Sequence, residues 1–168
     1  MIGKPLNFQQ RRADRCGPMM LRTMLTFALL LTSLAAQVKL REVDAARREL
    51  RPWLDAIAQV ESGGRDDAVG DNGKAIGRMQ IWRVYWQDAI EHCRALQDAT
   101  YEDVTERVYA ERILVAYMLR YCPQAVADKD YERMSRVHNG GPRGHRKEAT
   151  LGYWSRVSRA LATLTTKK

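Results

Sequence analysis

The chain has 168 residues and a formal net charge of +8, with 28 lysines and arginines against 20 aspartates and glutamates. This length allows one hydrophobic core but hardly two, so we expect a single domain. Hydrophobic residues make up 45% of the chain, a share that is too high for a disordered protein. The positive charge favours an anionic partner, such as nucleic acid, acidic lipid or an acidic wall polymer, and does not choose among them.

The N-terminal region has the pattern of a secretory signal. Residues 24–36, MLTFALLLTSLAA, carry no charge and follow five basic residues. Such a run is too short to span a bilayer and is typical of the apolar part of a signal peptide, with Ser33-Leu34-Ala35 as the cleavage site. We predict a signal peptide over residues 1–36 and a secreted or periplasmic protein without stable membrane insertion. A buried N-terminal helix and an uncleaved anchor are the alternatives.

Export would change both the charge and the cysteine content. Removing residues 1–35 takes away five basic residues and one acidic residue, which lowers the net charge from +8 to +4. Cys93 and Cys122 would remain, in an oxidising compartment. A disulfide between them would close a loop of about 30 residues and stabilise the fold by about 3 kcal/mol. Two free buried thiols are the alternative, and no spacing of cysteines or histidines predicts a metal site.

The mature chain begins with a segment in which we see no chemistry. Residues 37–51 are dense in arginine and glutamate and show no clear apolar stripe, so we expect a solvated or weakly helical lead-in. A helix follows from Pro52 to Ser62, where Gly63 and Gly64 end it. Asp71-Asn72-Gly73 then predicts a β-hairpin between Val69 and residues 79–81.

Apolar spacing predicts four further helices, over residues 84–96, from Thr100 to Tyr121, over residues 131–138 and from about Thr150 onwards. Thr100 with an acidic residue three positions later resembles an N-terminal cap. The chain is therefore predicted to form a mainly helical domain over residues 52–164, with one small β-hairpin.

Glu61 lies at an unusual place for a carboxyl group. It continues the face on which Leu54 and Ile57 are buried, in the last turn of the predicted helix. Loss of hydration raises a carboxyl pKa by up to several units, whereas the helix dipole contributes only about 0.3–1 kcal/mol. We therefore predict that Glu61 keeps its proton near neutral pH, as a general acid requires. A glutamate at the rim of the core that pairs with an arginine is the alternative.

Asp71 and the segment HNGGP at residues 138–142 are the other candidates for chemistry. Asp71 beside the hairpin turn is expected to be solvated and ionised, and two carboxyls in unlike environments are the pair with which glycosidases cleave an acetal. Ordinary turn chemistry also explains Asp71. The glycines and proline of HNGGP form a tight loop that brings its backbone and Asn139 close to a ligand, while His138 is equally explained as a structural group.

Several segments together resemble the invertebrate-type lysozyme (destabilase) family, in order and rough spacing over residues 52–160. They are VESG at 60–63, GRMQI at 77–81, YW at 85–86, YMLRY at 117–121, RVHNGGPRG at 136–144 and TLGYW at 150–154. The ESG, GxMQI and HNGGP motifs are also similar to lytic transglycosylases of the same superfamily. The resemblance implies an α+β lysozyme-like fold with the hairpin beside an active-site cleft.

The resemblance also implies roles for individual residues. Glu61 of the ESG motif corresponds to the catalytic acid, and Asp71 corresponds to its partner after a gap of one residue, with Asp67 or no second carboxylate as alternatives. The implied lining of the saccharide cleft consists of Ser62, Gln80, His138, Asn139 and Tyr153.

The sequence departs from the family in two respects. Invertebrate-type lysozymes are rich in cysteine, whereas the mature chain would keep two. Destabilases that cleave isopeptide bonds have a serine near the hairpin and a lysine after the QI motif. Here residues 73–75 are Gly-Lys-Ala and Trp82 follows Ile81, so we predict no isopeptidase activity.

We therefore expect a monomeric muramidase that needs no cofactor and hydrolyses the 1,4-β bond between N-acetylmuramic acid and N-acetylglucosamine in peptidoglycan. A lytic transglycosylase that forms 1,6-anhydromuramic ends is one alternative, and a non-catalytic cell-wall-binding module is another. Nucleic-acid binding agrees with the charge alone and is not expected.

Overall fold

The computed structural model describes residues 34–166, and the chain divides into two units, residues 1–37 and 38–168. Of the first unit only residues 34–37 are described, and they are helical. Nearly all of the signal peptide predicted at residues 1–36 thus lies outside the described residues. Within the described part of the chain, we find no helix with the length and apolarity needed to cross a membrane.

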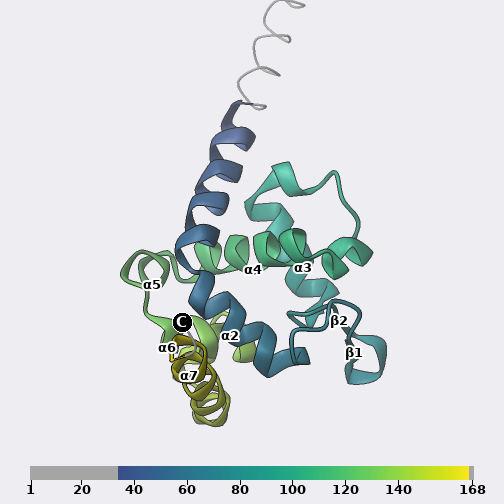
Figure 1. Ribbon diagram of the computed structural model, residues 1–168. Coiled ribbons are helices and arrows are strands. Elements are labelled where there is room, and N and C mark those ends of the chain that lie inside the picture. Colours follow the sequence, from purple (N-terminus) through teal and green to yellow (C-terminus); the bar gives the residue numbers. More distant parts are fainter. Residues whose placement is uncertain (1–33, 167–168) are drawn as a thin grey trace, which may run out of the picture. The chain divides into compact units, whose positions relative to one another are not determined.

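The second unit is mainly helical (Figure 1). Its first helical stretch covers residues 38–49. The helices that follow are α2 (Arg51–Ser62), α3 (Arg83–His92), α4 (Arg107–Tyr121), α5 (Pro123–Asp128), α6 (Tyr131–Gly140) and α7 (Leu151–Thr165). Short 3-10 helices connect them at Asp71–Gly73 (η1), Arg94–Leu96 (η2), Tyr101–Thr105 (η3), Gly144–Arg146 (η4) and Glu148–Thr150 (η5). The predicted mainly helical fold is confirmed.

A small antiparallel sheet lies between α2 and α3 in the chain. Its strands β1 (Val69–Gly70), β2 (Ala75–Ile76) and β3 (Ile81–Trp82) pair in the order β1-β2-β3. The predicted turn is present as η1, but the predicted strand pairing is wrong: Val69 pairs with Ile76 of β2, and residues 79–81 lead into β3, which pairs with β2. Gly77, at φ +76, follows β2, and a Cβ atom there would collide with the carbonyl of Val104. Glycine at this position therefore lets the sheet pack closely against η3.

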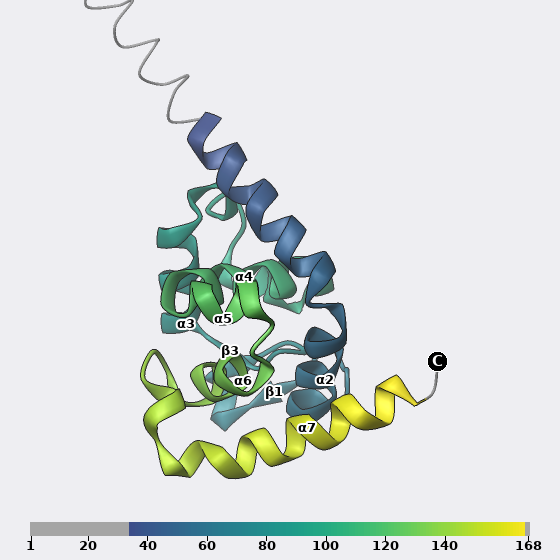
Figure 2. The same ribbon diagram turned by 90° about the vertical axis from the view of Figure 1, so that its left-hand side faces the viewer.

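Helix α4 runs through the middle of the unit, and α3, α5 and α6 pack against it (Figure 1). Nine of its residues, between Ala110 and Leu119, are buried. A helix that is buried on nearly all sides shows little amphipathic pattern. Helix α7 packs along α2 and α6 (Figure 2). This packing brings the C-terminal end of α2 close to the first turns of α7.

Residues 38–50 correct the prediction of a solvated lead-in. Val43 and Leu50 are 0% and 1% exposed and belong to the hydrophobic core. The segment lacks a clear apolar stripe because much of its buried face consists of charged side chains with partners on α4. Asp44 binds Arg112 of α4 at 2.8 Å, and Arg47 binds Glu111 of α4 at 2.9 Å.

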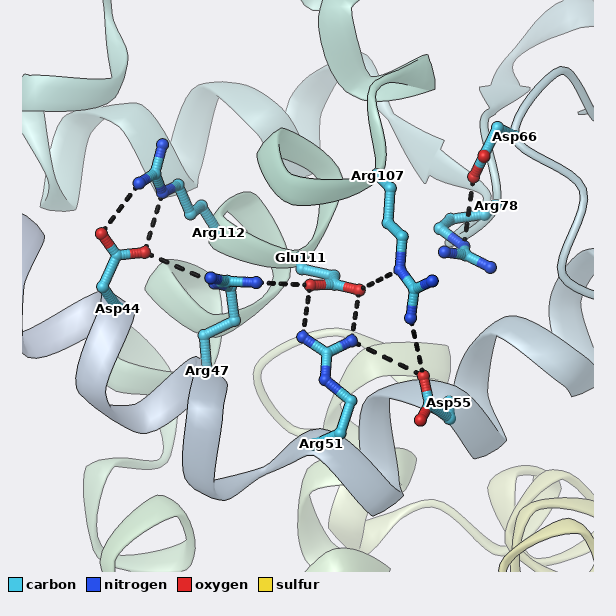
Figure 3. Close-up of polar contacts among 9 residues, drawn as sticks. All are labelled: Asp44, Arg47, Arg51, Asp55, Asp66, Arg78, Arg107, Glu111 and Arg112. Atoms are coloured by element: carbon cyan, nitrogen blue, oxygen red, sulfur yellow. Dashed lines mark hydrogen bonds and ion pairs between the residues drawn. The ribbon is translucent and has the colours of Figure 1, made fainter. Parts of the chain in front are cut away.

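Glu111 is the centre of this ion-pair cluster, and its side chain is 1% exposed. Arg51 donates to both carboxylate oxygens at 2.6 and 2.7 Å, and Arg107 and Arg47 donate at 3.0 and 2.9 Å (Figure 3). Burial raises the pKa of a carboxyl group, but hydrogen bonds from these arginines outweigh it and lower the pKa of Glu111 to about 2. The cluster ties the first helical stretch and α2 to α4.

Cys93 and Cys122 are buried and free. The structure thus shows two free buried thiols, which is the alternative to the predicted disulfide. Cys93 follows α3, whereas Cys122 follows α4, where its thiol lies 3.6 Å from the sulfur of Met118. Burial raises the pKa of the Cys122 thiol to about 11.

Candidate active site

Glu61 lies in the last turn of α2. The helix ends at Ser62 because Gly63 adopts the left-handed conformation, at φ 66° and ψ 22°, and the amides of Gly63 and Gly64 bind the last carbonyls of the helix. The apolar face of α2, including Trp53 and Ile57, is buried. Because this face packs against α7, the carboxyl group of Glu61 is held at the edge of the core.

Two side chains from other helices hold the Glu61 carboxyl group. Tyr153 of α7 donates its hydroxyl hydrogen to Oε1 of Glu61 at 2.7 Å. Nε2 of His138, on α6, lies 3.3 Å from the same oxygen. The side chains of Glu61 and His138 are 19% and 5% exposed, so the pair is largely shielded from water. The contact between these two groups is therefore insulated from the bulk solvent, while Glu61 still reaches the surface.

The pKa of Glu61 corrects the sequence-based prediction. Burial is indeed the largest single influence and raises the pKa, as expected. The hydrogen bond and positive charge of His138, the hydrogen bond from Tyr153 and the charge of Arg156 act in the opposite direction, and together they lower the pKa below its ordinary value. In the free protein Glu61 is therefore not a carboxylic acid that burial alone keeps protonated.

Tyr85 of α3 fixes the other side of His138. Its hydroxyl oxygen lies 3.3 Å from Nδ1 of His138. The Tyr85 ring stacks on Tyr117 of α4, with centroids 3.6 Å apart and planes at 12°. Burial raises the pKa of Tyr85 well above its ordinary value, so this residue stays a neutral hydroxyl group. The order of contacts is thus Tyr85, His138, Glu61 and Tyr153, which come from four different helices.

Glu61 opens into a pocket with a volume of about 430 Å³ between the sheet and helices α3 and α6. The lining residues are Glu61, Gly70, Asp71, Gln80, Trp82, Val84, Tyr85, Asp88, Tyr117, His138, Asn139 and Gly141. Asp71 lines this pocket with Glu61, and its carboxylate accepts a hydrogen bond from the indole nitrogen of Trp82 at 3.2 Å. With Asp88, the pocket has three carboxyl groups, of which that of Glu61 is largely shielded from water.

The other predicted cleft residues divide into two groups. Gln80 and Asn139 line the pocket together with His138. The side-chain amide of Gln80 donates to the carbonyls of Gly77 and Ala68, at 2.9 and 3.3 Å, and so holds the sheet beside the pocket.

Ser62 and Tyr153 do not belong to the pocket lining. The hydroxyl of Ser62 donates to the carbonyls of Ala58 and Arg78, at 3.2 and 3.0 Å, which connects α2 to the segment before β3. Tyr153 contacts the site through its hydrogen bond to Glu61 and through its ring, whose centroid lies 6.2 Å from that of His138.

Sequence reasoning missed Tyr85, Trp82 and Asp88 as site residues. Tyr85 entered the sequence analysis only in the YW segment of the resemblance, without a role, and its contact with His138 joins residues 53 positions apart. Trp82 had a signal that could have been used, because a tryptophan directly after a predicted strand that ends at Ile81 points away from the core side. It is 43% exposed in the structure.

The carboxyl groups of the pocket determine the chemistry that the site can do. A shielded carboxyl group with a histidine partner can protonate a leaving oxygen, and a second carboxylate in the same pocket can stabilise positive charge. No group of three or more histidine, cysteine, aspartate or glutamate side chains that could hold a metal ion occurs within residues 34–166.

The chain is similar in sequence to several known proteins. Residues 51–160 match the Destabilase family. The chain is 36% identical over 106 residues to lysozyme 1 of Crassostrea virginica, a match that covers 62% of this chain and 55% of that protein. It is 34% identical over 111 residues to a lysozyme of Meretrix lusoria, which covers 63% of this chain and 85% of the relative. The chain thus spans about half of the first relative and most of the second.

The fold is also similar to solved structures. The crystal structure of Meretrix lusoria lysozyme in complex with Aeromonas hydrophila PliI matches with a TM-score of 0.53 and 30% identity, over 64% of this chain and 87% of that chain. An inhibitor-bound structure of lysozyme from Meretrix lusoria matches with the same TM-score and 31% identity.

Proposed function

The chain belongs to the Destabilase family, and from this membership and the geometry of its pocket we propose that it is a muramidase. The reaction is hydrolysis of the 1,4-β bond between N-acetylmuramic acid and N-acetylglucosamine in peptidoglycan. The observation that carries the proposal is the Glu61 carboxyl group, held between His138 and Tyr153 at the wall of a pocket that Asp71 shares. The named lysozymes among its relatives support the same activity.

In this proposal, Glu61 protonates the leaving glycosidic oxygen, while His138 and Tyr153 hold its carboxyl group in place. A bound saccharide displaces water from the pocket and so adds to the burial that acts to raise the pKa of Glu61, against the contacts that lower it in the free protein. With its pKa raised in this way, Glu61 takes up a proton and becomes the general acid.

Asp71 has the second role. Its carboxylate faces the same pocket and is oriented by the indole nitrogen of Trp82. As the cleaved bond lengthens, positive charge develops at the anomeric carbon and its ring oxygen, and the Asp71 carboxylate in the same pocket stabilises it. The leaving sugar departs with the proton from Glu61. Water then adds its hydroxyl group to the anomeric carbon and gives its other proton to the Glu61 carboxylate, which restores the acid.

The products of digestion test this function. The experiment incubates purified protein with intact peptidoglycan and identifies the soluble fragments by mass spectrometry, with heat-inactivated protein as the control. Muramic acid residues with free reducing ends support the muramidase. Anhydromuramic ends, which lack one water molecule, would show a lytic transglycosylase instead. Protein that sediments with the wall and releases no fragments would show a non-catalytic binding module.

We further propose that the chain is exported and acts as a monomer on the glycan strands of the cell wall. The uncharged run at residues 24–36 and the basic residues before it support a signal peptide. N-terminal sequencing of the protein collected from the medium or periplasm tests this proposal. A new N-terminus near residue 36 supports it, and an intact N-terminus in the cell contradicts it.

A further inference from the structure

A second hollow adjoins the pocket of Glu61. It has a volume of about 300 Å³, and its lining residues are Gly73, Lys74, Trp82, Arg83, Val84 and Tyr101. Trp82 and Val84 line both hollows, so they form the ridge between them. Both side chains of this ridge are exposed, at 43% and 65%. A polymeric ligand bound in the first pocket can therefore extend, or direct a side group, past Trp82 into the second hollow.

The two hollows have opposite charges. The pocket of Glu61 contains three carboxyl groups, from Glu61, Asp71 and Asp88, and no lysine or arginine. The second hollow contains Lys74 and Arg83 and no acidic side chain. An anionic part of a ligand is therefore repelled from the first hollow and attracted to the second.

The two positively charged side chains of the second hollow lie over aromatic rings. The hydroxyl of Tyr101 donates to the carbonyls of Lys74 and Ile81, at 3.0 and 2.7 Å, which joins η3 to the sheet. The guanidinium of Arg83 lies 4.3 Å from the centre of the Tyr101 ring. The Lys74 ammonium lies 6.0 Å from the centre of the Trp82 ring.

Lys74 is the cation that is available to a ligand. Arg83 already pairs with Glu102 at 2.8 Å, in a contact where both side chains are more than half exposed. Among the residues that the structure describes, no carboxylate lies within 4.0 Å of the Lys74 ammonium. An incoming anion thus gains the charge of Lys74 without having to replace a protein partner.

We infer that the second hollow is a carboxylate-binding subsite, with Lys74 as its principal ligand-binding group. The inference rests on the proposed function, since it assigns the place of the acidic groups in the same substrate. Peptidoglycan carries carboxylates on the peptide that is amide-linked to the lactyl arm of muramic acid, and on the lactyl arm itself where no peptide is attached. With the glycan in the acidic pocket, these groups extend over Trp82 to Lys74. The subsite would thus favour acidic wall glycan over neutral glycan.

Binding experiments with a variant that does not consume the ligand test this subsite. In a Glu61→Gln background, calorimetry at low salt measures the Kd of three ligands: a peptide-bearing glycan fragment, the same glycan without peptide, and neutral chitotetraose. Lys74→Gln is expected to raise the Kd for the peptide-bearing fragment about two- to fivefold, the range of one exposed charge pair. Lys74→Arg is expected to retain the affinity. Arg159→Gln, which removes an exposed charge outside both hollows, is the matched control and should change nothing.

The three ligands separate the source of the carboxylate. An increase in Kd for the peptide-bearing fragment alone assigns the subsite to the peptide carboxylates. An increase for the peptide-free glycan shows that the subsite binds the free lactyl carboxylate, and both outcomes support the inference. An equal increase for neutral chitotetraose, or no increase for either acidic ligand, overturns it. If the wild type cleaves peptidoglycan and Lys74→Gln leaves every Kd unchanged, the subsite is refuted and the muramidase is not. If Lys74→Gln raises the Kd of the acidic ligands but the wild type cleaves no peptidoglycan, the muramidase is refuted and the subsite is not.

Discussion

Replacing the buried Glu111 by glutamine is expected to destabilise the fold by about 3 kcal/mol. The pKa of Glu111 is about 2 in the folded protein, against an ordinary value of 4.5. At about 1.4 kcal/mol for each pH unit, this difference stabilises the folded state by about 3 kcal/mol above pH 5. The same figure lies at the lower end of the cost of removing one partner from a buried ion pair, about 3–5 kcal/mol. Glu111→Gln keeps the volume of the side chain and leaves Arg47, Arg51 and Arg107 without their common anion.

Urea unfolding of the wild type and Glu111→Gln at several pH values measures this effect. Because folding lowers the pKa of Glu111, its stabilisation is complete above its unfolded pKa and is lost as the pH falls from about 5 to about 2. The two proteins should therefore differ by about 3 kcal/mol at pH 7 and converge as the pH approaches 2. Glu91→Gln is the control, since Glu91 binds Arg120 at 2.9 Å on the exposed surface. A difference below about 1 kcal/mol at pH 7, or one that persists unchanged to pH 2, would refute the reasoning.

Three further predictions concern the site, the thiols and the sheet. Tyr153→Phe removes a hydrogen bond that lowers the pKa of Glu61, so the alkaline limb of the plot of activity against pH should move to higher pH. An alkaline limb that stays at the wild-type pH contradicts this contact. Cys93 and Cys122 are buried and free, so a thiol reagent should label both only after unfolding. A reductant should leave the Tm unchanged, and a fall in Tm on reduction would indicate a disulfide. Gly77→Ala should lower the free energy of unfolding by more than about 1 kcal/mol, since φ is +76° and the added Cβ would meet the η3 backbone; unchanged stability in urea argues against that close approach.

The position of Glu61 could be predicted from the sequence, but the direction of its pKa could not. The spacing of apolar residues in α2 is local, and it placed Glu61 at the end of a buried stripe. The hydrogen bond that opposes burial comes from Tyr153, 92 residues away, and the charge comes from His138 on another helix. Neither partner is visible in a pattern of neighbouring residues. Desolvation was therefore judged without the contacts that offset it.

The fold shows the same division between local and distant causes. Helix ends at glycine and proline, and the Asp-Asn-Gly turn of the hairpin, follow from nearby residues and were predicted. The burial of residues 38–50 was missed because their charged face is neutralised by Glu111, 64 positions from Arg47. The middle strand, β2, was missed because a strand of two residues has no periodicity to detect. The state of the two cysteines depends on where separate helices place them.

The rate of peptidoglycan cleavage by Glu61→Gln tests the central proposal most directly. Glutamine keeps the size of the side chain but cannot donate the proton that the leaving oxygen requires. The account predicts that kcat/KM falls at least about 100-fold, the usual contribution of a general acid, while Glu148→Gln, an exposed carboxylate outside the pocket, cleaves like the wild type. A Glu61→Gln protein that cleaves as fast as the wild type would contradict the account.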